Sequence, residues 1–324
     1  RKRKLFQQQQ VPFADLEPDG ELVRRIADMR FRKEDGAYYA LTPLQQADAA
    51  RLFSKRYSLV NWQQGCGKTV VSFQWGNWLL QEGRVRNVIV VAPAVATNLT
   101  WIDFLKTQGV PFRCINRPEE IRSAQSGEFL VLSTSMLGRR LWDLKRFLRL
   151  TARRHALVFD ESDEISNAYS KRTRYLLDLF RRLPFKMLST GTATRNDISE
   201  LYSQLSLLYS HSYNFLCCCP FLYLPDKETG ELEEKANDYY MKPFPVKGGN
   251  RVFQACYSPG KKSVFGIRKN SQDIYNADDL RRILEYTVIT RRFREVAGNK
   301  YSVDNVSVVP GQGEIAVYRK VLDE

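Results

Sequence analysis

The chain has 324 residues, which is long enough for one large domain or two smaller ones around a sizeable core. Hydrophobic residues make up 43% of it, which excludes a largely disordered protein. Lys and Arg outnumber Asp and Glu by 50 to 36, a formal net charge of +14, and such an excess attracts polyanions such as nucleic acid. No apolar run approaches the roughly 18 residues of a membrane span, so we expect no membrane partner.

The first ten residues are basic and then glutamine-rich, with no apolar stretch of the kind that a secretory signal carries. The chain does not begin with Met, so we expect a fragment or a processed form. Six cysteines without a CxxC pair, and only two histidines, favour neither a zinc site nor a disulfide framework. We therefore predict buried thiols in an intracellular protein, nuclear if eukaryotic and cytoplasmic if bacterial or viral.

The chain begins with a polar segment, residues 1–40, in which an amphipathic stretch over Glu21–Arg32 predicts an accessory helix. Between residues 41 and 210, apolar runs alternate with helical patterns. The expected strands are Ser58–Trp62, Asn87–Ala92, Phe129–Ser133, Ala156–Asp160 and Lys186–Thr190. The expected helices are Pro43–Phe53, Lys68–Gln81, Leu99–Lys106, Leu141–Thr151, Arg172–Arg182 and Ile198–Leu208. This alternation predicts an α/β fold, a parallel sheet with helices on both faces.

Residues 211–277 break this rhythm, because they are rich in Tyr, Pro and Gly. We interpret them as a peripheral insertion that includes a β-hairpin around the turn Asp226–Gly230. Helical character returns in the last segment, residues 278–324. There we expect one helix over Asp278–Tyr286 and the start of another over Glu314–Leu322.

A glycine-rich loop, Gly65-Cys66-Gly67-Lys68-Thr69, lies between the first strand and a helix. Its glycines let backbone N–H groups turn toward phosphate oxygens, and the helix N-terminus adds a partial positive charge. Lys68 would then reach the β- and γ-phosphates, and the Thr69 hydroxyl would bind Mg²⁺. The longer form of this motif has Gly where this chain has Trp62. The pattern predicts a nucleoside triphosphate site rather than a simple helix cap.

Two carboxylates, Asp160 and Glu161, follow a buried strand at the end where open α/β sheets bind ligands. Asp160 is suited to hold Mg²⁺ through water, and Glu161 to deprotonate an attacking water. The alternative for Asp160 alone is an ordinary helix N-cap. Together with the glycine-rich loop, the pair predicts a site of triphosphate hydrolysis in which Lys68, Asp160 and Glu161 are catalytic.

Two further segments have both a functional and a purely structural interpretation. Thr190, Gly191 and Thr192 end the next strand, where their groups would couple the phosphate state to bound nucleic acid or would simply form a turn before a helix. The stretch Arg139–Arg154 holds seven Lys and Arg residues and one acid. Its leucines fall at helical spacing, so it presents either a phosphate-binding or a merely solvated cationic face.

The succession of motifs resembles the first motor lobe of the Swi/Snf-type chromatin-remodelling ATPases of helicase superfamily two. The resemblance covers residues 41–210 and 278–324. Besides the glycine-rich loop, the matching segments are Leu41–Gln45, Val90–Pro93, Ser133–Ser135, Asp160–Asn167, Thr190–Asn196 and Thr290–Arg292. The chain departs from the family in having Asp163 where a His is usual, in Thr194-Arg195, and in an insertion unlike the usual helical one.

The resemblance implies a RecA-like lobe that uses ATP and Mg²⁺ to translocate along double-stranded DNA. ATP would lie between this lobe and a second RecA-like lobe that supplies arginines, so the chain alone would be nearly inactive. Gln45 would contact adenine. The nucleic-acid contacts implied by motif position, together with the two arginines suggested by charge, are Pro93, Ser133, Thr134, Ser135, Arg139 and Arg140.

Three alternatives remain open from the sequence. A restriction-type translocase and an RNA helicase of superfamily two use the same motor. A catalytically silent lobe that binds DNA as a scaffold belongs to another class. The intact set of Lys68, Thr69, Asp160 and Glu161 argues against such decay.

Overall fold

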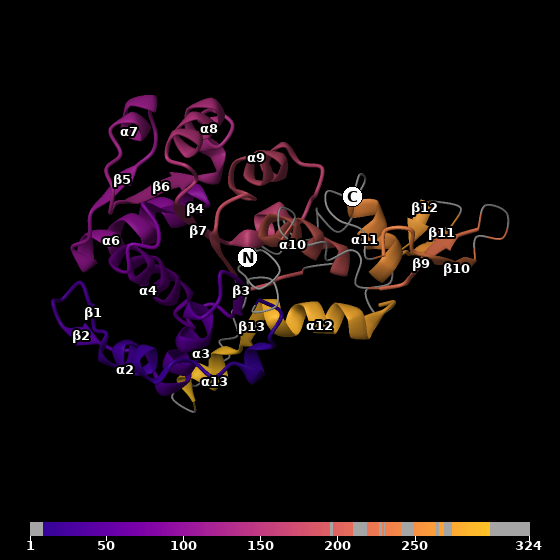
Figure 1. Ribbon diagram of the computed structural model, residues 1–324, viewed down its shortest axis with the longest axis horizontal. Coiled ribbons are helices and arrows are strands. Elements are labelled where there is room, and N and C mark those ends of the chain that lie inside the picture. Colours follow the sequence, from indigo (N-terminus) through magenta and orange to yellow (C-terminus); the bar gives the residue numbers. More distant parts are fainter. Residues whose placement is uncertain are drawn as a thin grey trace, which may run out of the picture.

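Seven parallel strands form the central sheet in the order β13-β3-β8-β7-β4-β6-β5 (Figure 1). The computed structural model describes residues 9–194, 197–209, 219–226, 229, 231–240, 249–263, 266–268 and 274–298. The strands of the sheet are β3 Tyr57–Trp62, β4 Asn87–Ala92, β5 Phe112–Cys114, β6 Phe129–Ser133, β7 His155–Asp160, β8 Phe185–Thr190 and β13 Val288–Arg291. All five expected strands are confirmed, each to within one residue.

The side chains of each central strand alternate between two hydrophobic cores, one on each face of the sheet. On β7, Leu157 and Phe159 join one core, whereas Ala156 and Val158 join the other. Burial on both faces explains why these strands are near-continuous apolar runs. The predicted RecA-like sheet with helices on both faces is therefore confirmed.

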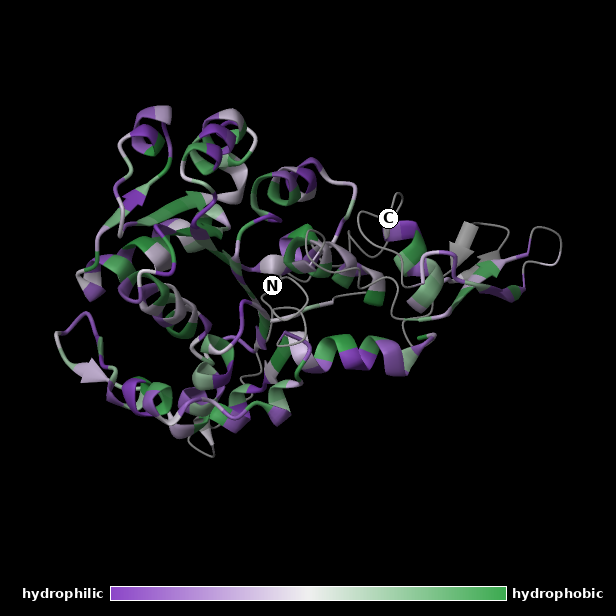
Figure 2. Cartoon of the chain, in the orientation of Figure 1, coloured by the Kyte–Doolittle hydropathy of each residue, from purple (hydrophilic) through white to green (hydrophobic). Residues whose placement is uncertain are grey.

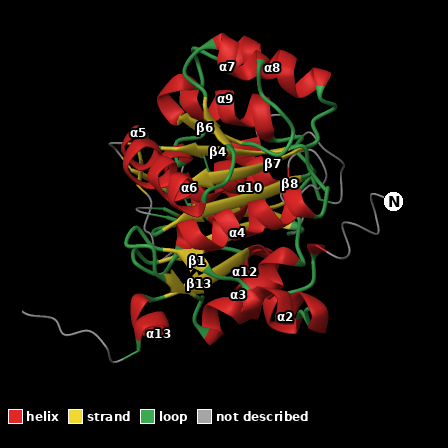
Figure 3. Cartoon of the chain, turned by 90° about the vertical axis from the view of Figure 1, so that its left-hand side faces the viewer, coloured by secondary structure: helices red, strands yellow, loops and turns green. Residues whose placement is uncertain are grey.

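Helices cover both faces of the sheet, and Figure 3 shows β6, β4, β7 and β8 side by side among them. Residues of one core come from α2 Gly20–Asp28, α3 Pro43–Phe53, α4 Lys68–Gln81 and α6 Ile102–Gln108. Residues of the other come from α7 Pro118–Arg122, α8 Leu141–Leu150, α9 Lys171–Phe180, α10 Leu201–Tyr209, α11 Gly249–Tyr257 and α12 Ala277–Thr287. None of the described helices is long and apolar enough to cross a membrane.

The N-terminal segment packs on the α3 and α4 side of the sheet, where Phe13, Ile26 and Phe31 are buried in the core. The accessory helix α2 is confirmed, but it ends at Asp28, and a short hairpin of β1 Phe31–Arg32 and β2 Tyr38–Tyr39 follows. The buried Lys55 ammonium ties this segment to α12. It donates to the carbonyl of Val11 at 2.5 Å and to that of Tyr286 in α12 at 2.6 Å. Burial lowers the pKa of Lys55 to about 7.

The structure differs from the predicted elements at several places. The helix expected over Leu99–Lys106 begins as a short α-helical turn, α5 Ala94–Ala96, and a π-helical turn, Thr97–Trp101. The helix expected from Ile198 begins with a 3₁₀ turn, Ile198–Glu200. The strands β5 and β13 and the helices α7 and α13 Phe293–Ala297 were not predicted, because three to five residues give too few periods for a pattern.

The elements between α10 and α12, which are β9 to β12 and α11, project from one side of the sheet (Figure 1). The expected hairpin is confirmed, since β9 Phe221–Pro225 pairs antiparallel with β10 Leu232–Ala236. A second hairpin joins β11 Lys261–Ser263 to β12 Gly266–Arg268. The insertion boundaries at 211 and 277 stay a prediction. The helix expected over Glu314–Leu322 and the residues Arg195 and Asn196 lie outside the described residues.

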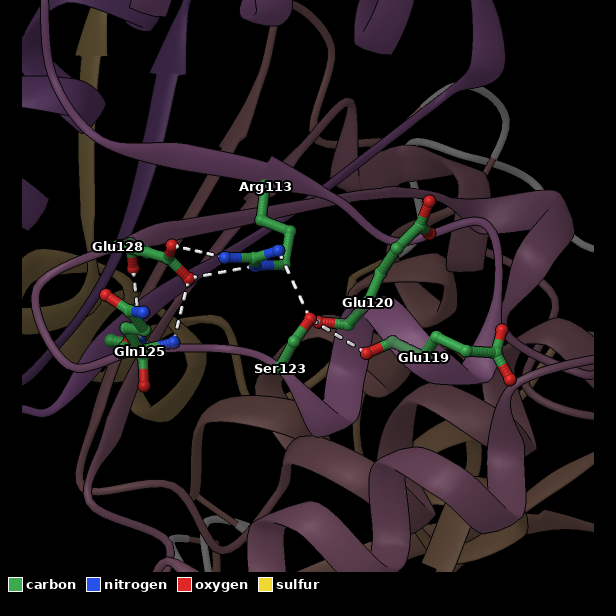
Figure 4. Close-up of polar contacts among 7 residues, drawn as sticks. Arg113, Glu119, Glu120, Ser123, Gln125 and Glu128 are labelled. Atoms are coloured by element: carbon green, nitrogen blue, oxygen red, sulfur yellow. Dashed lines mark hydrogen bonds and ion pairs between the residues drawn. The ribbon is translucent and has the colours of Figure 1, made fainter.

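An ion pair adds to the packing of Phe112 and the backbone pairing with β6 in holding the edge strand β5 (Figure 4). Arg113 donates to both carboxylate oxygens of Glu128, at 3.0 and 2.7 Å, and to the Ser123 hydroxyl at 3.2 Å. The hydrogen bonds from Arg113 lower the pKa of Glu128. A carboxyl whose pKa is lower in the folded than in the unfolded protein stabilises the fold above its unfolded pKa, and this contribution is lost in acid.

We predict that Arg113→Met lowers the free energy of unfolding by about 1 kcal/mol at neutral pH, where Glu128 is ionised. The difference from wild type should shrink as the pH falls below about 4, because Glu128 then takes up a proton in both proteins. Urea denaturation at the two pH values measures it. Arg122→Met, which removes an exposed ion pair to Glu119, is the control. An equal loss of stability at both pH values would contradict this assignment.

Candidate functional site

The carboxyl ends of three neighbouring strands, β3, β8 and β7, carry the loops that the sequence singled out. The loop after β3 reaches α4 through Gly65 and Gly67, whose φ angles of +83° and +86° favour glycine. A Cβ atom at Gly65 would lie 2.8 Å from a ring carbon of Phe293, and one at Gly67 would lie 2.8 Å from Nε2 of Gln45. Both glycines are therefore required by conformation and by space.

The structure brings the loop and the carboxylates together around one open cavity of about 540 Å³. The residues that line it are Gln63, Gln64, Lys68, Glu161, Asp163, Gly191, Thr192 and Phe293. Four of these were predicted site residues, from three different strands. The Lys68 ammonium donates to the Trp62 carbonyl at 3.0 Å. The volume lies within the range of about 300–1,000 Å³ that small-molecule sites occupy.

Glu161 directly follows the last residue of β7 and has a left-handed backbone conformation, with φ of 51°. Burial raises its pKa, and the negative charges of Asp160 and Asp163 raise it further. The charge of Lys68 and hydrogen bonding from the Gly191 backbone act in the opposite direction. A carboxylate whose pKa is raised accepts a proton more readily, as a general base must.

Asp160 lies behind the cavity rather than in its wall. Its Oδ2 accepts from the Trp101 indole at 2.9 Å and its Oδ1 from the Ser189 hydroxyl at 2.8 Å. The side chain is buried. Oδ1 also accepts from the Glu161 backbone at 3.2 Å. Since a carboxylate oxygen has two lone pairs, Oδ2 alone keeps one toward a water shared with a cation. The family resemblance includes Trp101, which follows Val90–Pro93 in the matching motif, but it assigned no contact to Trp101 and no role to Ser189.

The ends of β7 and β8 are joined by a second buried carboxylate. The Thr190 hydroxyl donates to Asp163 at 3.0 Å and accepts from the Thr192 backbone at 3.1 Å. Next to it, Gln204 of α10 accepts from the Ser162 hydroxyl at 2.9 Å and donates to the carbonyl of Ala193 at 2.8 Å. The predicted coupling segment is thus tied to the carboxylate loop through Asp163 and Gln204, of which only Asp163 is visible in a motif.

Gln45 supports the glycine-rich loop from α3. Its Oε1 accepts from the Thr42 backbone at 2.8 Å in a capping box, and its Nε2 donates to the Cys66 carbonyl at 2.8 Å. The side chain of Cys66, which belongs to this loop, is buried, and burial raises the pKa of its thiol. Both ends of the Gln45 amide therefore have protein partners.

Thr69 faces away from the cavity that holds Lys68. It lines a second open cavity of about 570 Å³, between the hairpin of β1 and β2 and the helix α6. Arg32, Lys33, Tyr39 and Phe104 also contribute to its walls. The predicted phosphate-binding and metal-binding residues of the loop therefore belong to two adjoining hollows.

The returning strand β13 braces the glycine-rich loop from its other side. The Arg291 carbonyl accepts from the Gln63 backbone at 3.0 Å, and the Gln63 side chain accepts from the Phe293 backbone at 2.8 Å. The Arg291 guanidinium donates to both oxygens of Asp48, at 2.7 and 2.8 Å. The match of Thr290–Arg292 to a motif signalled this region, but its contact with α3 could not be derived from sequence.

We predict that Arg291→Met destabilises the fold by about 3 kcal/mol at neutral pH, because it leaves the carboxylate of Asp48 buried without its main partner. Burial already raises the pKa of Asp48, and Arg291 is the chief group that lowers it. In the variant, stability should fall as the pH rises through the raised pKa, so acid restores part of it.

Thermal unfolding across this pH range measures the effect. Adding Asp48→Asn to Arg291→Met should remove the pH dependence, and the exposed Arg294→Met is the matched control. A deficit in Arg291→Met that does not change with pH would contradict the role given to Asp48.

The predicted nucleic-acid residues lie at the same edge of the sheet, beyond β7. Pro93 follows β4, and Ser133 ends the neighbouring β6. The hydroxyls of Ser133 and Ser135 are 2.8 Å apart, whereas Thr134 is buried. Arg139 is exposed, and Arg140 pairs with Asp143 at 3.5 Å. The structure thus places these residues on one side of the cavity rather than in it.

No protein-family model matches the chain, and no curated protein sequence matches it. One similar solved structure is the Sulfolobus solfataricus SWI2/SNF2 ATPase core in complex with dsDNA, with a TM-score of 0.53 and 14% identity over 81% of this chain and 46% of that chain. Another is the UvsW helicase of bacteriophage T4, with a TM-score of 0.45 and 10% identity over 59% of this chain and 67% of that one.

The likeness to the first of these structures shows the fold, and this chain spans a little less than half of that protein's length. The chain therefore has a RecA-like α/β fold. The resemblance to the first lobe of the Swi/Snf-type motors, indicated by the order of the motifs, is confirmed at the level of the fold.

Proposed function

We propose that the chain is the ATP-binding lobe of an ATP-dependent double-stranded DNA translocase. The observation that carries this proposal is the convergence of Lys68, Glu161 and Gly191 from three strands on one cavity. The same edge of the sheet continues to Ser133, a predicted DNA contact. Motor chemistry needs both a nucleotide site and a nucleic-acid surface on one rigid element.

In this proposal the residues present fit a nucleoside triphosphate with Mg²⁺. The glycine-rich loop supplies backbone N–H groups, and Lys68 supplies the positive charge for the terminal phosphates. The bound cation offsets negative charge on the phosphates. Thr69 and Asp160 lie outside the wall of this cavity, so they would hold the cation at its border, with Asp160 acting through water, and Gln45 would support the base end of the site.

Glu161 is the proposed general base. It is partly buried beside Lys68, so it can accept a proton from a water held near the cavity. The hydrogen bonds of Thr190 and Thr192 around Asp163 would pass a change at the phosphates to the adjoining nucleic-acid edge. A second RecA-like lobe would supply an arginine to the terminal phosphate, a contribution of roughly 10³–10⁵ in rate.

We predict different consequences for two substitutions in the cavity. Lys68→Ala should raise the Kd for ATP·Mg about thirtyfold, because a charge-assisted phosphate contact is worth about 2 kcal/mol. In the full-length protein with its second lobe, Glu161→Gln should spare binding but lower single-turnover hydrolysis by roughly 10²–10⁴, because the amide cannot accept the proton. Fluorescent-nucleotide titration and product quantification measure the two effects. Wild-type hydrolysis by Glu161→Gln would contradict the base assignment.

Binding to a DNA duplex tests the second part of the proposal. Affinity should fall steeply with salt and depend little on sequence, because phosphate contacts release counterions. The double substitution Arg139→Ala and Arg140→Ala should make the slope of log binding constant against log salt concentration shallower. The change should be about 0.9 for each phosphate that is no longer neutralised. Tighter binding to duplex RNA than to duplex DNA would contradict the proposal that duplex DNA is the substrate, and it would favour an RNA helicase. A restriction-type translocase shares the expected DNA result, and a silent scaffold would bind DNA without hydrolysing ATP.

A further inference from the structure

One tryptophan of this chain is placed unlike the others. Trp142 on α8 has 77% of its surface exposed, whereas Trp62, Trp75 and Trp101 are fully buried and Trp78 is 9% exposed. A large ring in water has no packing role in the fold, and its exposure is not needed by the proposed nucleotide cavity. The Trp142 ring is therefore accessible to a ligand outside that cavity.

Helix α8 has two sharply different sides, which Figure 2 shows as hydrophobic and hydrophilic colours on the same helix. Leu144, Phe147 and Leu148 are buried in the core. The opposite side carries a stripe of residues at helical spacing, which we call the α8 stripe: Trp142, Lys145, Arg146 and Arg149. One exposed ring thus shares this side of the helix with three cationic side chains.

The charges of the α8 stripe are only partly neutralised. Lys145 pairs with Asp178 of α9, but Arg146 and Arg149 make no ion pair with any described residue. The Lys145 ammonium lies 4.8 Å from the centre of the Trp142 ring. This cation–π contact holds the ring from one side and leaves it largely exposed. The stripe offers an oriented aromatic surface on the same side of α8 as the exposed Arg146 and Arg149.

We propose that the α8 stripe binds single-stranded nucleic acid, with one unpaired base stacked on Trp142 and adjacent phosphates on Arg146 and Arg149. Aromatic rings next to cationic side chains recognise single strands, because an unpaired base has an open face. The bases of a duplex stack on one another and present no such face to Trp142. Helix α8 begins at Leu141, directly after Arg139 and Arg140 of the proposed duplex surface, so the stripe starts next to that surface. This strand site is independent of the nucleotide cavity.

Tryptophan fluorescence reads this site directly, because four of the five rings are buried. Titration of the whole chain with a single-stranded oligothymidylate should quench the emission and shield it from iodide. An equal titration with a blunt DNA duplex should leave the Trp142 signal accessible to iodide. Arg146→Ala with Arg149→Ala should shallow the salt slope of strand binding by about 0.7 for each phosphate that is no longer neutralised.

Anisotropy of a labelled oligothymidylate separates stacking from folding effects. Trp142→Ala should bind about tenfold more weakly, the effect expected when one base no longer stacks. Trp142→Phe should keep most of the affinity, since Phe retains an aromatic face. The control Tyr38→Ala removes a ring of β2 whose exposure is similar to that of Trp142 and which lies on the side of the sheet away from α8. This variant should bind as wild type. Lys68→Ala should also bind as wild type, which distinguishes this site from the nucleotide cavity.

Three results would overturn the proposal. Unchanged strand affinity in Trp142→Ala would show that the ring does not stack on a base. Equal shielding of Trp142 by the DNA duplex would show that the stripe does not select unpaired bases. A dimer at working concentration that dissociates in Trp142→Ala would make the stripe a protein interface, since Trp and Arg also dominate such surfaces.

Discussion

The parallel register of β3, β8 and β7 determines where every part of the candidate site lies. It aligns Asn61 with Thr190 and Asp160 with Ser189, so the three loops that follow begin at one edge. Two buried hydrogen bonds, from Ser189 to Asp160 and from Thr190 to Asp163, then join the ends of β8 and β7 to one another. Because buried carboxylates are costly without partners, these bonds stabilise the strand order and fix the cavity together.

The stability of the fold and the shape of the site are coupled through residues far apart in the sequence. Arg291 reaches the chain's main sheet only after the long segment that carries the two hairpins, yet it pairs with Asp48 and holds the backbone of Gln63. The glycine-rich loop is therefore clamped between α3 and β13. Such a clamp keeps backbone N–H groups oriented before a ligand arrives, which lowers the entropic cost of binding.

Much of this architecture was predictable because the strands of the sheet are buried on both faces and read as apolar runs. The motifs singled out Lys68, Glu161 and Gly191, and the structure places all three in the wall of one cavity. Pattern could not reveal β13, which has four residues and becomes a strand only because β3 leaves an edge to pair with. Nor could it reveal that Asp160 turns toward Trp101 while Thr69 faces a second hollow, since side-chain direction depends on tertiary packing.

The nucleotide site is tested most directly by a crystal structure of the chain with Mg²⁺ and a non-hydrolysable ATP analogue. We expect a triphosphate along the Gly65–Thr69 backbone, with its terminal phosphate between Lys68 and Glu161 and the cation near Thr69 and Asp160. A nucleotide ordered elsewhere on the protein, with the cavity between Lys68 and Glu161 filled only by water, would show that this lobe does not use the site proposed for it.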